Sequence, residues 1–293
     1  MRLPHILLAV AVAAVWGVNF VAIKLGLRDL PPFLFTSLRF MLASLPVLAL
    51  GMRAGPPIPW RYVIGIGVPL GAVQFPLLFL GMDVGMTAGL ASLVLQSQAF
   101  FTALFAVFAL GDRPGPRQIA GMLLAFAGIG LIATEMPTGD SLLGLLLTLA
   151  AAASWGLANI VMKKAKAPDL FRMMVWVSLI PPLPLLALSF LAEGPDRIAH
   201  AFANLTWVGV GALVYIAAGA TLFGFAAWGF LMRHYPASLV APFSLLVPIF
   251  GMSSSALLLG ETFTTLKLAG GLLVFCGLAL SVLKLPALAR AKA

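Results

Sequence analysis

The chain consists largely of ten long apolar runs, and this feature limits the folds that it can adopt. The runs cover residues 5–24, 33–50, 61–82, 88–110, 117–134, 142–162, 170–192, 205–232, 237–259 and 266–284. A helix needs about 20 apolar residues to cross the hydrocarbon core of a bilayer. Only helices and closed barrels satisfy their backbone hydrogen bonds in lipid, and runs of this length and uniformity are typical of helices. The sequence therefore predicts an all-α integral membrane protein with ten transmembrane helices.

The amino-acid composition argues against a soluble protein. Charged residues make up 9% of the 293 residues and hydrophobic residues 62%, whereas a soluble domain has about 25% charged residues. The net charge of +9 does not indicate nucleic-acid binding, because the basic residues are scattered singly between apolar runs. The first run continues to Ile23 without a convincing cleavage site, so we interpret it as an uncleaved helix. We expect the lipid bilayer to surround most of the chain, with no room for a separate soluble domain.

The distribution of Lys and Arg between the loops predicts the orientation of the helices. One set of loops contains 13 basic residues, namely Arg2, Arg53, Arg61, Arg113, Arg117, Lys163, Lys164, Lys166, Arg172, Arg233, Lys284, Arg290 and Lys292. The opposite set contains four, namely Lys24, Arg28, Arg197 and Lys267. Loops rich in Lys and Arg stay in the cytoplasm. The sequence therefore predicts a multi-pass protein of the bacterial inner membrane with both termini in the cytoplasm.

The two halves of the chain share motifs in the same order. The matched features are Trp16-Gly17 with Trp155-Gly156, Lys24 with Lys163 at the same spacing, Leu110-Gly111-Asp112 with Leu259-Gly260-Glu261, and Gly128 with Gly277. Five helices in each half make the second half enter the membrane from the opposite side, which is an inverted-topology repeat. We predict one repeat over residues 1–136 and a second over 137–293. The longer connection that the second repeat needs is placed in the 193–204 loop.

Several segments resemble a known transporter family over nearly the whole chain. They are Trp16-Gly17-Val18-Asn19-Phe20, Leu38-Arg39-Phe40, residues 88–96, Gly111-Asp112-Arg113, Ser154-Trp155-Gly156 and residues 241–248. These segments resemble the drug/metabolite transporter superfamily, and within it the EamA-type branch of ten-helix exporters. The resemblance implies a secondary transporter that exports amino acids or related small metabolites by alternating access, through a central cavity between two five-helix repeats. Drugs or other metabolites are the alternative substrates.

Polar and aromatic residues inside the apolar runs are the candidates for substrate binding, because polar groups in lipid are costly. The candidates are Trp16, Asn19, Arg39, Gln74, Gln96, Trp155, Asn159, Tyr215, Trp228 and Ser244. Trp16 and Asn19 lie one turn apart on the same helix face, and Trp155 and Asn159 repeat this pairing in the second half. We expect the two pairs to form opposing walls of a site. The alternative is that the Trp-Gly steps allow close helix packing while the Asn side chains bond across helices.

For Arg39 and the glutamines, the sequence also indicates where the side chains could point. Arg39 lies about seven residues into the second run, roughly 10 Å along the helix. Its planar fork would bind a substrate carboxylate, or its side chain would extend to the membrane interface; the sequence leaves both open. Residues two apart on a helix point about 200° away from each other. Gln96 and Gln98 are therefore not expected to face one cavity together, and Gln96 is the preferred candidate.

Proline and glycine residues inside the runs predict where helices bend or pack closely. Proline removes a helix hydrogen bond and kinks the axis, so we interpret Pro69, Pro76, Pro242 and Pro248 as gating positions; ordinary membrane-helix proline is the alternative. The small faces formed by Gly121, Gly128, Gly270 and Gly277 would pack within the monomer or against another subunit. The chain is accordingly predicted to be a monomer or a weak homodimer.

Other function classes lack the residues that they need. The chain has no G-x-x-x-x-G-K-[ST] phosphate loop, and its three histidines have no second ligand at metal spacing. We therefore expect no cofactor, no metal and no catalytic group. A membrane-embedded lipid-modifying enzyme would need clustered acids, but the acidic residues here lie in separate loops. Because none lies deep in a run, we expect transport without proton coupling, or coupling at an end-located group such as Asp83. The single cysteine, Cys276, is predicted to be buried.

Overall fold

Every regular element is helical in the computed structural model, which describes residues 1–49, 55–136 and 140–282. Eight helical segments of these residues are long and apolar enough to cross a membrane, and Pro32–Val47 and Thr265–Ser281 are shorter apolar helices. The prediction of an all-α membrane protein is confirmed. Several predicted features lie at or beyond the edges of the described ranges. They are Arg53, Lys284, Arg290, Lys292 and the repeat boundary after residue 136.

The first half contains two spans that are each built from three helical pieces. Its elements are α1 (Leu3–Gly26), α2 (Pro32–Ala49), α3 (Trp60–Ile66), the π-helical η2 (Gly67–Gln74), α4 (Phe75–Asp83), α5 (Ala88–Val94), the 3₁₀-helical η3 (Leu95–Ser97), α6 (Gln98–Leu110) and α7 (Pro116–Thr134). The pieces α3, η2 and α4 form one continuous span, and α5, η3 and α6 form another.

The second half has the same kinds of element and one short additional helix. Its elements are α8 (Asp140–Ala165), α9 (Leu170–Val177), α10 (Pro182–Ala192), α11 (Pro195–Ala203), α12 (Trp207–Val214), the π-helical η4 (Tyr215–Phe223), α13 (Gly224–His234), α14 (Ala237–Val240), the 3₁₀-helical η5 (Ala241–Leu245), α15 (Leu246–Leu259) and α16 (Thr265–Val282). The connection predicted as a loop over 193–204 contains α11. This short helix starts at Pro195, directly after Gly194 in a positive-φ conformation (83°), and the first turn of a helix accommodates proline.

Irregular helical segments occur at matching positions in the two halves. Gly260 lies 149 residues after Gly111, and the same shift carries η2 onto residues 216–223, which lie within η4. It also carries η3 onto residues 244–246, which overlap η5. Proline, which lacks a backbone donor, lies in η2 (Pro69) and in η5 (Pro242). The other two predicted gating prolines lie at the start of α4 (Pro76) and within α15 (Pro248).

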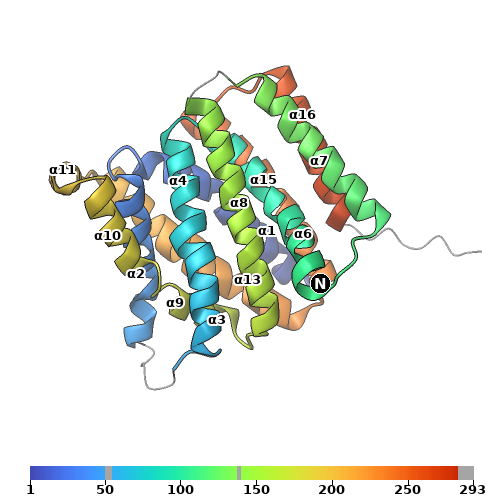
Figure 1. The fold of residues 1–293 in the computed structure, drawn as a ribbon, viewed down its shortest axis with the longest axis horizontal. Coiled ribbons are helices and arrows are strands. Elements are labelled where there is room, and N and C mark those ends of the chain that lie inside the picture. Colours follow the sequence, from blue (N-terminus) through green and yellow to red (C-terminus); the bar gives the residue numbers. More distant parts are fainter. Residues whose placement is uncertain (50–54, 137–139, 283–293) are drawn as a thin grey trace, which may run out of the picture.

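Helices α7 and α16 lie side by side at one edge of the bundle (Figure 1). A Cβ atom added to Gly128 would lie 2.5 Å from the carbonyl oxygen of Gly270, and one added to Gly121 would lie 2.5 Å from that of Gly277. Side chains at these positions would force the helices apart. The four glycines therefore pack within the monomer. Cys276 lies on the exposed surface of α16, so the prediction that it is buried is wrong.

Large apolar side chains cover the outer surface of the bundle. Trp207 is 90% exposed, Leu257 84% and Phe108 82%. A soluble protein seldom exposes large contiguous apolar patches of this kind, whereas lipid tails solvate such side chains readily. The exposed apolar residues therefore mark the membrane-facing surface, and the polar residues inside the bundle require a separate explanation.

Candidate functional site

A cavity of about 330 Å³ lies inside the bundle, with walls from both halves of the chain. Its lining includes eight of the ten predicted binding residues, namely Trp16, Asn19, Arg39, Gln96, Trp155, Asn159, Trp228 and Ser244. The other two, Gln74 and Tyr215, are not among the lining residues. Gln74 is fully buried, and the Tyr215 hydroxyl donates to the carbonyl oxygen of Val15 at 3.0 Å. Tyr215 therefore joins η4 to α1.

The cavity has a largely apolar wall that the sequence analysis did not identify. The additional lining residues are Phe20, Leu70, Phe75, Leu78, Leu95, Gln98, Met162, Leu170, Ala220, Phe225, Ala241 and Val247. Gln96 and Gln98 both line the cavity, so the expectation that only one of them faces it is wrong. The physical reason is η3, because a 3₁₀ turn has three residues per turn and changes the angle between neighbouring side chains.

Trp16 forms an aromatic wall that is fixed to the opposite half of the chain. Its indole Nε1 donates to the carbonyl oxygen of Ala220 in η4 at 2.9 Å. Its ring lies 5.7 Å from that of Phe225 and 5.2 Å from that of Trp228, measured between centroids. The indole also packs against Gly224, where a Cβ atom would collide with it. Trp16 is thereby held in one orientation while it lines the cavity.

The Trp-Gly segments also bring helix backbones into close contact. A Cβ atom added to Gly17 would lie 2.5 Å from the Cβ of Phe250 and 2.8 Å from the carbonyl oxygen of Val247 on α15. One added to Gly156 would lie 2.8 Å from the Cβ of Phe101 on α6. Each Trp-Gly step therefore serves two purposes, because the glycine permits close packing of helices while the tryptophan faces the cavity.

The amide side chains of the cavity differ in how fully they are hydrogen-bonded. Asn159 Nδ2 donates to Gln98 Oε1 at 2.6 Å and to Thr102 Oγ1 at 3.0 Å, so it bonds across helices. Gln96 Nε2 donates to the carbonyl oxygen of Ser244 at 3.0 Å. Asn19 is 7% exposed, yet its Oδ1 atom has no hydrogen-bond partner. Among these amides, Asn19 thus has a buried acceptor to which the described residues donate no hydrogen bond.

Arg39 is buried in the bundle and does not extend to the membrane interface. The side chain is 2% exposed, and Nε and Nη2 both donate to Thr221 Oγ1, at 3.2 and 3.0 Å. Its Cζ atom lies 3.7 Å from the centroid of the Phe75 ring. The remaining nitrogen, Nη1, has no hydrogen-bond partner. No Asp or Glu of the described ranges lines the cavity, so the guanidinium has no carboxylate beside it there.

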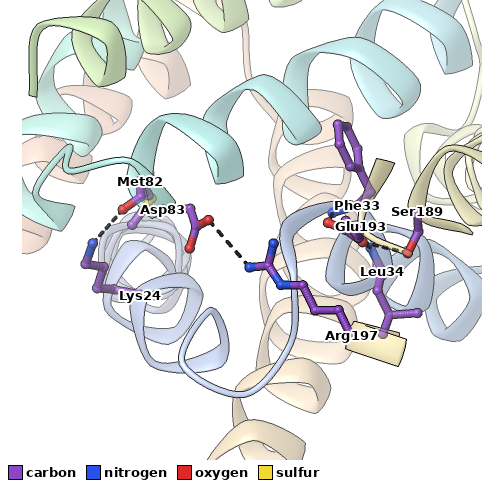
Figure 2. Close-up of polar contacts among 8 residues, drawn as sticks. All are labelled: Lys24, Phe33, Leu34, Met82, Asp83, Ser189, Glu193 and Arg197. Atoms are coloured by element: carbon purple, nitrogen blue, oxygen red, sulfur yellow. Dashed lines mark hydrogen bonds and ion pairs between the residues drawn. The ribbon is translucent and has the colours of Figure 1, made fainter. Parts of the chain in front are cut away.

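At one end of the bundle, the partly buried carboxylate of Glu193 caps a helix from the other half of the chain (Figure 2). We call this end the Lys24 end. Glu193 accepts hydrogen bonds from the backbone N–H groups of Phe33 and Leu34, at 2.7 and 3.1 Å, and from Ser189 Oγ at 2.6 Å. The first N–H groups of a helix have no partner within the helix, and negative charge is favourable there. Glu193 therefore fixes the start of α2 to the end of α10.

Two further carboxylates at the Lys24 end make the same kind of contact. Glu261 accepts from the backbone N–H groups of Ala88 and Gly89 at the start of α5, at 2.7 and 3.0 Å. Asp29 accepts from the backbone N–H and the hydroxyl of Thr206, directly before α12, at 3.0 and 2.5 Å. Each contact joins a residue of the first half to one of the second. The two halves are thus held together at this end.

Basic side chains add contacts at the Lys24 end. Lys24 Nζ donates to the carbonyl oxygen of Met82 at 2.5 Å, and Arg197 pairs with Asp83 at 4.0 Å (Figure 2). The Arg197–Asp83 pair is partly exposed and long, so it contributes little stability. The carboxylate contacts with helix starts therefore dominate the closure of this end.

At the opposite end, which we call the Lys163 end, the contacts between the two halves include a hydrogen bond between His5 Nδ1 and the Tyr235 hydroxyl at 2.7 Å. Met162, in the last turn of α8, and Leu170, at the start of α9, line the cavity near this end. Lys163 pairs with Asp112 at 2.8 Å, but the two side chains are 60% and 51% exposed. Solvent-exposed pairs contribute about 0–1 kcal/mol. Through Met162 and Leu170, the cavity extends from the middle of the bundle toward this end.

Comparison with known proteins places the whole chain among transporters. The model of the EamA-like transporter family matches residues 3–134 and 142–283. A Salmonella typhimurium protein named "Probable amino-acid metabolite efflux pump" is 42% identical over 281 residues, covering 94% of this chain and 93% of its own length. The Escherichia coli K12 protein of the same name is 40% identical with the same coverage.

Two more distant likenesses extend over nearly the full length. A Streptantibioticus cattleyicolor protein named "Probable terminal-alkyne amino-acid exporter" is 26% identical, covering 96% of this chain and 94% of its own. A solved structure described as "Crystal structure of protein" is 22% identical and superposes with a TM-score of 0.62, covering 96% of this chain and 97% of its own. The structural likeness supports the fold alone.

Proposed function

Because this chain belongs to the EamA-like transporter family, we propose that it exports amino acids or related small metabolites by alternating access. As a member of that family it is a transporter and not an enzyme. The cavity of about 330 Å³ carries the proposal, because its size lies at the lower end of the range for ligand pockets. Its aromatic walls and few polar groups suit a small amphipathic molecule. The names of the relatives at 40–42% identity favour amino-acid metabolites.

We infer that the ten apolar segments form two inverted five-helix repeats, over residues 1–136 and 137–293. The matched positions of η2 and η4, and of η3 and η5, support this inference. So does the separate match of the family model to each half. The close contact of α1 with α15 has its counterpart in that of α8 with α6. A monomer is sufficient for such an arrangement, since α7 and α16 pack on each other.

We further propose that the Lys24 end faces the periplasm and the Lys163 end the cytoplasm, in a bacterial inner membrane. The excess of Lys and Arg in the loops at the Lys163 end supports this orientation, and α1 begins there. The cavity then extends toward the cytoplasm, and the carboxylate caps join the two halves at the periplasmic end. Such a conformation is the one in which an exporter binds its substrate.

The proposed substrate contacts are the eight predicted residues that line the cavity, together with Phe75 and Gln98. Gating is assigned to Pro69, Pro76, Pro242 and Pro248. Pro69 and Pro242 lie in helical segments that depart from α geometry, and in many inverted-repeat transporters discontinuous helices form the substrate site around which the repeats rock. These segments supply the bends on which the two halves are proposed to rock.

The proposed function predicts transport of amino acids by the purified protein. In proteoliposomes we expect saturable flux of at least one of labelled L-leucine, L-phenylalanine and L-methionine. Trp155→Ala is expected to lower that flux about tenfold, because it removes a cavity wall worth about 1.4 kcal/mol of binding. Trp207→Ala is the matched control, since Trp207 is 90% exposed on the outer surface of the bundle. Equal loss in both variants, or no flux of any of the three acids, would contradict the proposal.

Transport is also expected to be independent of a proton gradient. No Asp or Glu of the described residues lines the cavity, and proton coupling inside a membrane usually needs a buried carboxylate. We therefore expect the initial rate of flux to change by less than about twofold when a pH gradient is imposed across the vesicles. Strong acceleration by the gradient would refute uncoupled transport and direct attention to Asp83.

A further inference from the structure

We propose that Arg39 binds the carboxylate of the substrate and that Asn19 accepts a hydrogen bond from its ammonium group, so that the cavity selects free α-amino acids. This inference rests on the proposed function, since it specifies how the same cavity recognises its substrate. Two atoms carry it, Nη1 of Arg39 and Oδ1 of Asn19. Both are buried and both lack a hydrogen-bond partner. One is a cationic donor and the other a neutral acceptor, and both residues line one cavity.

The charge of Arg39 is not neutralised by the protein. A buried charge is costly unless it is paired, and an uncompensated buried charge is strongly destabilising. Arg39 is 2% exposed, and two of its nitrogens share a single hydroxyl, that of Thr221. The lining residues include no carboxylate. An anionic ligand would therefore supply the missing counter-charge. Binding of such a ligand would explain why Arg39 is buried despite the free-energy cost of an unpaired charge.

The guanidinium is also held in a fixed orientation. The Phe75 ring lies against Cζ at 3.7 Å, in the range of a cation–π interaction. Thr221 Oγ1 donates to the carbonyl oxygen of Ile216, five residues earlier, which the π-helical geometry of η4 makes available. The plane of the guanidinium is thus set before a ligand arrives. A planar fork held in this way suits a carboxylate, and prior ordering lowers the entropic cost of binding.

Asn19 complements Arg39 for a zwitterion. Its Oδ1 atom accepts hydrogen bonds but carries no net charge, so it contacts an ammonium group without neutralising Arg39. A bare amine finds no carboxylate in the cavity and meets an unneutralised cation. An α-amino acid presents both groups on one carbon, and its side chain then meets the aromatic wall formed by Trp16, Trp155 and Phe225. The substrate class is therefore amino acids whose carboxylate and amine are both free.

Competition in proteoliposomes tests the role of the carboxylate. Flux of labelled L-leucine, L-phenylalanine and L-methionine is measured against each unlabelled acid, its methyl ester and its decarboxylated amine. We expect each transported acid to compete about tenfold or more better than its ester or amine, because a site built to bond a group rejects analogues that lack it. Equal competition by ester and acid would overturn the inference while leaving transport intact. Absence of all flux would instead contradict the proposed function.

Substitution of Arg39 separates recognition from a structural role. Arg39→Gln is expected to lose the preference for acid over ester, and Arg39→Lys to keep part of it, since Lys retains the charge without the fork. The melting temperature of Arg39→Gln in detergent is expected to equal or exceed that of the parent protein, because an unneutralised buried cation is removed. A marked fall in melting temperature with the acid preference retained would overturn the inference. Arg61→Gln, at an exposed arginine, is the control.

Substitution of Asn19 tests the second contact independently. Asn19→Leu has a similar volume and no acceptor, so we expect it to lose the preference for the free amino acid over the N-acetyl derivative. Its preference for acid over methyl ester is expected to persist, since Arg39 is unchanged. If Asn19→Leu and Arg39→Gln instead alter the same selectivity, the assignment of one substrate group to each residue is wrong.

Discussion

Gly17→Val is expected to destabilise the protein by about 3 kcal/mol, at the upper end of the usual cost of overpacking. A Cβ atom at this position would lie 2.5 Å from the Cβ of Phe250 and 2.8 Å from the backbone nitrogen of Gly251. The neighbouring atoms belong to the backbone or its first carbon, so they cannot turn aside as the end of a side chain would. Relief of the collision requires α1 to move away from α15. Thermal denaturation in detergent, followed by size-exclusion chromatography, measures the loss.

Gly156, the position in the second half that corresponds to Gly17, provides a second test of destabilisation by overpacking. Gly156→Val is expected to act similarly, because a Cβ atom there would lie 2.9 Å from the backbone nitrogen of Thr102. Gly130→Val is the matched control, since it places the same β-branched residue in a membrane helix where no atom lies within 4 Å of the new Cβ. An equal loss in Gly130→Val would mean that helix propensity, rather than packing, determines the effect.

Glu193→Gln is expected to weaken the closure of the Lys24 end. The carboxylate accepts three hydrogen bonds, two of them from the first turn of α2. A neutral amide has one acceptor oxygen and loses the favourable interaction with the helix dipole. Hydrogen bonds to charged groups contribute about 1.5–3 kcal/mol each, so a loss of about 2 kcal/mol is expected. Because Glu193 follows α10 and caps α2, the two halves separate more readily at this end.

Cysteine labelling measures that separation directly. Cys276→Ser removes the native thiol, and Phe20→Cys places a new one at a buried position of the cavity wall. With Glu193→Gln we expect labelling by a membrane-impermeant maleimide, added at the Lys24 side, to become several times faster. Asp196→Asn removes the same charge from an exposed position three residues away and is expected to leave the rate unchanged. Unchanged labelling with Glu193→Gln would show that this cap does not hold the end closed.

The positions of the helices and much of the cavity lining could be predicted from the sequence for a single physical reason. Lipid penalises polar groups, so a polar residue within an apolar run either bonds to another helix or faces a cavity. That rule identified Asn19 and Asn159 without distinguishing between these outcomes. The structure separates them, because Asn159 bonds to Gln98 on α6 while Oδ1 of Asn19 has no partner.

What could not be predicted depends on changes of helical geometry and on packing. A uniform α-helix would separate Gln96 from Gln98, and only the 3₁₀ turn between them places both at the cavity. The burial of Arg39 depends on the position of η4, whose Thr221 receives its hydrogen bonds. Apolar residues that line the cavity, such as Phe75, are of the same types as those that face lipid. No sequence pattern separates these two environments until the helices are assembled.

The carboxylate caps at the Lys24 end affect how the closure of this end responds to ionic strength. In the proposed orientation that end meets the medium outside the cell membrane, where ionic strength varies. Dissolved ions screen exposed charge pairs, but they screen partly buried ones far less. Glu193 and Glu261 bond to backbone N–H groups in partly buried positions, whereas Lys163 and Asp112 are exposed. In that orientation we expect these two carboxylate caps to keep the outer end closed when the salt concentration outside changes, whereas the exposed Lys163–Asp112 pair is screened more strongly.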